Sequence, residues 1–66
     1  MISDLDILRC ANLMVRTHGE EAVGFARKRV DELGAKGDSE GRRVWILITA
    51  AVAGLLGHPL QLERLQ

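Results

Sequence analysis

The residues best suited to chemistry lie between the first two predicted helices. His18 precedes Gly19, and two carboxylates, Glu20 and Glu21, follow. A histidine beside a carboxylate can act as a general base. However, no nucleophile or glycine-rich anion loop accompanies these residues, and a protonated histidine also suits the negative end of a helix dipole. The pattern therefore favours a structural role for His18, and the sequence contains no candidate catalytic residue.

Cys10 is the only cysteine, so an internal disulfide is excluded. Cys10 and His18 would lie on one helix, about 80° apart in projection and about two turns apart in height, which is poor geometry for a shared metal ion. We therefore predict a half-buried apolar Cys10, no metal, no cofactor and no enzymatic activity.

Two basic clusters are candidates for nucleic-acid contact. The first is Arg27-Lys28-Arg29 and the second is Arg42-Arg43. Lysines and arginines can contact phosphates, but a helix that reads bases also needs polar side chains, and the segment 44–56 is almost entirely aliphatic. A solvated face is favoured over nucleic-acid binding. A small DNA-associated regulator remains the alternative, and its phosphate contacts would be Arg27, Arg29, Arg42 and Arg43.

These residues must be positioned by a very small domain. The chain has 66 residues, of which 47% are hydrophobic and 27% charged, and nine basic side chains balance nine acidic ones. This composition is globular and excludes a polybasic binder that acts through bulk charge. A chain of this size buries only about 60% of its unfolded surface, so a lone monomer is marginally stable.

The hydrophobic spacing predicts an all-α fold, a small three-helix bundle with a short C-terminal tail. We expect the helices at about 3–18, 20–33 and 39–56, a domain over 1–57, and a tail over 58–66 that could add one helical turn.

The predicted helix ends follow from the residues that cap and stop helices. Ser3 is the expected first cap, with Ile2 and Ile7 as a hydrophobic staple. Thr17 and Glu20 have capping-box spacing for the second helix.

The remaining ends are marked by glycines and by one carboxylate. Gly19, Gly34 and Gly57 are the expected stops, and Pro59 reinforces the last one. Asp38 or Ser39 begins the third helix. Trp45, in its early turns, is expected to anchor the core.

No targeting or membrane-spanning segment is expected. The N-terminus is acidic where a secretory signal would be basic. The longest apolar run covers residues 44–56, which is shorter than the roughly 20 residues that a spanning helix needs. We therefore expect a cytoplasmic protein. Association of the third helix with a membrane surface is the least favoured alternative, because its amphipathicity is weak.

The third helix is apolar nearly all round, which is the main anomaly of the sequence. A helix that is apolar on two sides must be buried on two sides, and two short companion helices comfortably cover only one. Ala50 and Gly54 are spaced i, i+4, a pattern that lets two backbones approach closely. We therefore predict a homodimer through this helix.

The predicted interface combines helix-3 residues with two residues at the edges of their own apolar stripes. It consists of Ile46, Leu47, Ala50, Ala53, Gly54, Leu13 and Phe25. The competing interpretation is that helix 3 passes through the centre of a tight bundle and is covered by its own chain.

The pattern His18-Gly19, Gly37-Asp38, Gly41 and Val44-Trp45 resembles a family of short uncharacterised three-helix proteins of alphaproteobacteria. The resemblance covers about residues 4–56. It implies a three-helix fold and no assigned activity, so no functional residue is carried over. Relatives tend to be polar or charged at positions 46, 47, 50, 53 and 54, where this chain is apolar. The difference agrees with an interface on the third helix.

Overall fold

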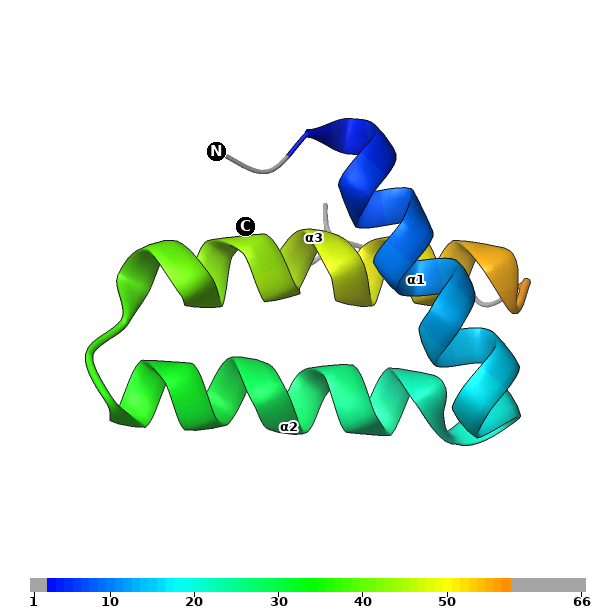
Figure 1. Cartoon of the computed structure of the whole chain (residues 1–66). Coiled ribbons are helices and arrows are strands. Elements are labelled where there is room, and N and C mark those ends of the chain that lie inside the picture. The colour runs from blue at the N-terminus through cyan, green and yellow to red at the C-terminus, as the bar shows by residue number, and fades with distance from the viewer. Residues whose placement is uncertain (1–2, 58–66) are drawn as a thin grey trace.

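The computed structural model of the chain describes residues 3–57, and this part is entirely helical, without strands (Figure 1). Helix α1 spans Asp4–His18, the short 3₁₀ helix η1 spans Gly19–Glu21, α2 spans Ala22–Ala35 and α3 spans Ser39–Leu55. The all-α prediction is confirmed for these residues. The first two predicted helices are not separated by a loop, because η1 joins them. Helical residues therefore form two unbroken stretches, 4–35 and 39–55. The predicted tail, 58–66, lies outside the described residues.

Helix α3 is the element on which the others pack. It runs antiparallel to α2 as a hairpin, and α1 crosses it near its C-terminal half (Figure 1). Helix α3 contacts both α1 and α2 extensively, whereas α1 and α2 touch each other much less.

The predicted cap at Ser3 is confirmed. The Ser3 hydroxyl accepts a hydrogen bond from the amide of Asp6 at 3.2 Å, and the Asp6 carboxylate accepts one from the amide of Ser3 at 3.4 Å. This reciprocal pair is a capping box, and Asp4 and Asp6 also place negative charge at the positive end of the helix dipole. Ile2 of the predicted staple lies outside the described residues.

The predicted capping box between Thr17 and Glu20 is wrong. Thr17 lies within α1, and neither η1 nor α2 has a side-chain cap at its first residue. The chain instead turns at Gly19, whose φ of +57° is a conformation that side-chain-bearing residues rarely adopt. Gly19 therefore ends α1, as predicted, and Thr17 cannot cap the next helix because it still lies within α1.

The predicted stop at Gly34 is also wrong, since α2 continues to Ala35. A Cβ on Gly34 would lie 3.3 Å from Cδ of Arg42, so the glycine makes room for the Arg42 side chain. The reversal occurs at Gly37, which has a φ of +77°.

Helix α3 begins at the predicted cap and is followed by the predicted glycine. The Asp38 carboxylate accepts a hydrogen bond from the amide of Gly41 at 2.9 Å. The helix gives way to a turn at Leu56 and Gly57, and Gly57 has a φ of +77°. Pro59 lies outside the described residues.

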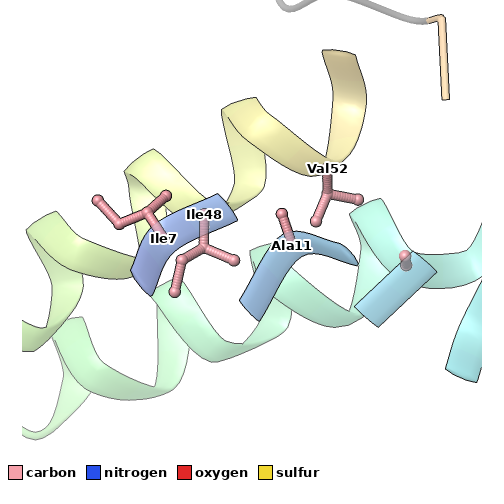
Figure 2. Close-up of a cluster of buried hydrophobic side chains, with 5 residues drawn as sticks. Ile7, Ala11, Ile48 and Val52 are labelled. Carbon is pink, nitrogen blue, oxygen red and sulfur yellow. The ribbon is translucent and has the colours of Figure 1, made fainter. Parts of the chain in front are cut away.

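The core is built largely from small side chains. Its central cluster is Ile7, Ala11, Ala22, Ile48 and Val52, part of which is seen in Figure 2. Ala11, Ala22, Ala26 and Ala53 have no exposed surface, and Ile48 and Val52 are the largest fully buried side chains among residues 3–57. The alanines let the helices approach closely, but they bury little apolar area each.

Candidate functional site

More large apolar side chains are exposed than buried in the described part of the chain. The buried ones are Ile7, Leu33, Ile48 and Val52. The exposed ones are Leu5, Leu8, Leu13, Phe25, Leu47 and Leu55. A small domain with a thin core gains more than most from covering such side chains, because apolar burial is its main source of stability. The surface apolar residues are therefore the candidate site.

One group of these residues lies along α3 on the side away from its buried positions. Ile46, Leu47, Ala50 and Gly54 form this group, which we call the outer α3 face. Leu47 is 48% exposed, and a Cβ on Gly54 would meet no atom within 4 Å. Ile46 and Ala50 are half-buried at its border. Spacings of three, four and seven residues keep Leu47, Ala50 and Gly54 on one side of the helix.

Ala53, predicted to join this group, is fully buried within the chain. The buried residues of α3 are Ile48, Thr49, Val52 and Ala53, which form two adjacent stripes. The buried part of the helix circumference is wide because α3 packs against both α1 and α2. Thr49 is tolerated inside because its hydroxyl donates a hydrogen bond to the carbonyl of Trp45 at 2.7 Å. We therefore leave Ala53 out of the candidate surface.

Leu13 and Phe25, the other two predicted interface residues, are 63% and 52% exposed. Phe25 does not adjoin the outer α3 face, because it lines a hollow with Trp45. Trp45 and Leu47 are two residues apart, which places them about 200° apart around the helix axis. Sequence periodicity describes one helix at a time, so it could not show that Phe25 of α2 lies away from the outer α3 face.

Two hollows are each lined in part by Phe25 and Lys28. The larger has a volume of about 420 Å³ and is bounded by Glu20, Glu21, Gly24, Phe25 and Lys28. The smaller has a volume of about 220 Å³ and is bounded by Met14, Phe25, Lys28, Arg29, Glu32 and Trp45. The larger hollow is lined by residues of η1 and α2, whereas the smaller one is lined by residues of α1, α2 and α3. Sequence analysis missed them, although Phe25, at the edge of the apolar stripe of its helix and beside Gly24, was a signal.

Arg29 is held at the edge of the smaller hollow. Its guanidinium carbon lies 6.0 Å from the centroid of the Trp45 ring, and its Nη1 lies 3.5 Å from a carboxylate oxygen of Glu32. The contact with Trp45 is a cation–π interaction, and that with Glu32 is an i, i+3 ion pair.

The structure divides the four arginines of the nucleic-acid alternative. Arg27 and Arg29 are two residues apart on α2, so they project to opposite sides of that helix. Arg42 lies against Gly34, and Arg43 is exposed at the start of α3. Since the four do not share one surface, no observation on the described residues favours that function.

His18 and Cys10 have structural surroundings. The His18 ring stacks on Phe25 with a centroid separation of 3.8 Å and an interplanar angle of 17°. Cys10 is half-buried against the core, as predicted. Within residues 3–57, no three histidine, cysteine or acidic side chains gather into a group that could hold a metal ion. None of the helices in that range combines the length and the hydrophobicity needed to cross a bilayer.

Comparisons with models of known protein families, with curated proteins and with solved structures gave no match to this chain. The candidate site therefore depends on the geometry of the molecule alone.

Proposed function

We propose that the chain is a small three-helix interaction module that pairs with a second copy of itself through the outer α3 face. The observation that carries the proposal is that Leu47 and Gly54 are exposed, with the half-buried Ala50 between them, on a helix whose opposite side is buried against α1 and α2. Its biological role would be that of an adaptor or regulator that binds another protein. We place it in the cytoplasm, since a single unpaired cysteine is typical of a reducing compartment.

The outer α3 face is complementary to itself. A twofold axis passing between Ala50 and Ala51 would place Leu47 of one copy opposite Gly54 of the other, and each such contact would occur twice. A large side chain would then face a position without a side chain, so the two helices could approach closely. This match of large to small is why a second copy is the proposed occupant.

We also propose that the chain is related to the family of short helical proteins that it resembles. The structural roles of the shared residues support this. Gly37 reverses the chain, Asp38 caps α3, and a Cβ on Gly41 would lie 2.6 Å from a carboxylate oxygen of Asp38. These shared residues support a common fold, and they imply no activity.

The substitution Ala50→Glu tests the α3 contact. It would place two like charges at the centre of the contact, so the solution mass should fall relative to wild type in sedimentation equilibrium. Ala35→Glu is the matched control, because Ala35 is exposed at the end of α2 and its substitution should leave the mass unchanged. An unchanged mass for Ala50→Glu, with wild type self-associated, would assign the interface elsewhere.

A further inference from the structure

We propose that α2 carries a second self-association site, an antiparallel contact with α2 of another copy, centred between Gly24 and Phe25. This contact is separate from the outer α3 face and does not depend on it. Helix α2 lies along one edge of the molecule, with α3 beside it on one side only (Figure 1).

Gly24 is the first observation behind this proposal. It is the third residue of α2 and lies inside the helical stretch 22–35, and glycine is among the poorest helix formers. A Cβ there would meet no atom within 4 Å, and its φ is not positive, so neither packing within the chain nor backbone conformation requires a glycine. Contact with another molecule would explain the glycine, because a position without a side chain lets a second helix approach closely.

Phe25 is the second observation. It is 52% exposed, and His18 stacks on one face of its ring at 3.8 Å. The two hollows that Phe25 lines leave space beside the ring. An exposed aromatic ring that is already held in place loses little conformational freedom on binding, which suits an interface anchor.

The charged residues next to Gly24 and Phe25 are complementary to those of a second copy in antiparallel orientation. Glu21 lies on one side of the Gly24–Phe25 pair and Lys28 on the other, and both line the larger hollow. Neither forms an ion pair within residues 3–57. A twofold axis between Gly24 and Phe25 brings Glu21 of each copy to the partner's Lys28, so both charges are matched.

The same axis brings Phe25 of each copy over the partner's Gly24. The hollow beside Gly24, with a volume of about 420 Å³, would receive the ring. A single antiparallel arrangement therefore places Phe25 against Gly24 and also pairs Glu21 with Lys28. This complementarity is why we propose a second copy as the occupant. A chain that has both this contact and the α3 contact would assemble beyond a dimer, into a tetramer or an open chain.

Charge exchange tests the α2 contact. The variants are made with Ala50→Glu, so that the α3 contact does not contribute. Ala50→Glu alone should dimerise, whereas adding Glu21→Lys or Lys28→Glu should raise the dimer Kd at least about tenfold, because like charges then face each other. Mixing these two variants should give a heterodimer, since the copies again carry opposite charges. Circular dichroism verifies that each variant keeps its helix content.

The results separate the two contacts. Unchanged mass for both charge variants, or no heterodimer on mixing, overturns the α2 contact. A monomeric Ala50→Glu protein overturns it as well and leaves the α3 contact standing. If charge reversal at Glu21 or Lys28 dissociates the wild-type chain and Ala50→Glu does not lower its mass, the α2 contact stands and the α3 contact is wrong.

Gly24→Ala gives a second test, because its effect on association should be opposite to its effect on stability. Alanine should raise the melting temperature of the dissociated chain, because it is the better helix former and nothing obstructs its Cβ. The same substitution should weaken association of the Ala50→Glu protein, because the partner's Phe25 could no longer approach as closely. Unchanged or tighter association would contradict the proposed contact.

Discussion

Ala53 and Gly54 are adjacent in α3 but lie on different sides of it: Ala53 has no exposed surface, and a Cβ on Gly54 would meet nothing within 4 Å. This pair marks the boundary between the part of α3 that holds the fold together and the part that is open to another molecule. Substitutions at the two positions should therefore have opposite effects on the isolated chain.

Ala53→Leu should lower the free energy of unfolding by about 1–3 kcal/mol, because a larger side chain has no space in the close-packed core. Gly54→Ala should not lower it, and the better helix propensity of alanine favours a gain of up to about 1 kcal/mol. Urea denaturation at low concentration, where the chain is dissociated, measures both values. A destabilising Gly54→Ala together with a harmless Ala53→Leu would mean that the boundary is misplaced.

The thin core makes the loss of a single large side chain severe. Ile48 is 1% exposed, so Ile48→Ala should cost about 2–5 kcal/mol, which is a large part of the total stability of a domain this size. Leu47→Ala is the matched control, because Leu47 is half exposed and should cost the isolated chain less than about 1 kcal/mol. Trp45 is the only tryptophan, and its fluorescence can follow unfolding. Equal costs for the two variants would contradict the packing described for α3.

The cap at the start of α3 gives a prediction about coupling. Asp38→Ala removes the acceptor for the Gly41 amide and should cost about 1 kcal/mol. Gly41→Ala should also destabilise the chain, because its Cβ would lie 2.6 Å from the Asp38 carboxylate and displace it. The double variant should cost no more than Asp38→Ala alone, since the added methyl group then meets no carboxylate. Additive losses would show that the two residues act independently.

The turn between α2 and α3 depends on a glycine with a positive φ. Gly37 has a φ of +77°, and a Cβ there would meet no atom within 4 Å, so the cost of Gly37→Ala comes from the backbone alone. We expect a loss of about 1 kcal/mol in thermal or urea unfolding. Gly37→Asn should cost less, because asparagine tolerates this conformation better than alanine does. Equal effects of the two substitutions would argue against this explanation.

Helix ends marked by a local side-chain or glycine signal were predictable from the sequence. Ser3 and Asp38 cap their helices, and Gly57 follows α3, as their residue types indicate. The start of the next helix was not predictable in the same way, because α1 extends through Thr17 to His18 and η1 then begins without a side-chain cap. The role of Gly34 could not be predicted locally, because it depends on Arg42 in another helix.

The candidate surface was predictable only in part, for a similar reason. Periodicity correctly separated Leu47 and Gly54 from Ile48 and Val52. It could not assign Thr49 and Ala53, because the width of the buried arc depends on how α1 and α2 pack around α3. The hollows beside Phe25 also need the three-dimensional arrangement, since one of them is bounded by residues of all three helices.

The solution mass of the wild-type chain, followed by sedimentation equilibrium over a wide concentration range, tests the central claim most directly. The mass should rise to at least twice the 7.3 kDa of one chain, and Ala50→Glu should lower it at every concentration where wild type is assembled. A mass of one chain throughout the range would contradict self-association through the outer α3 face.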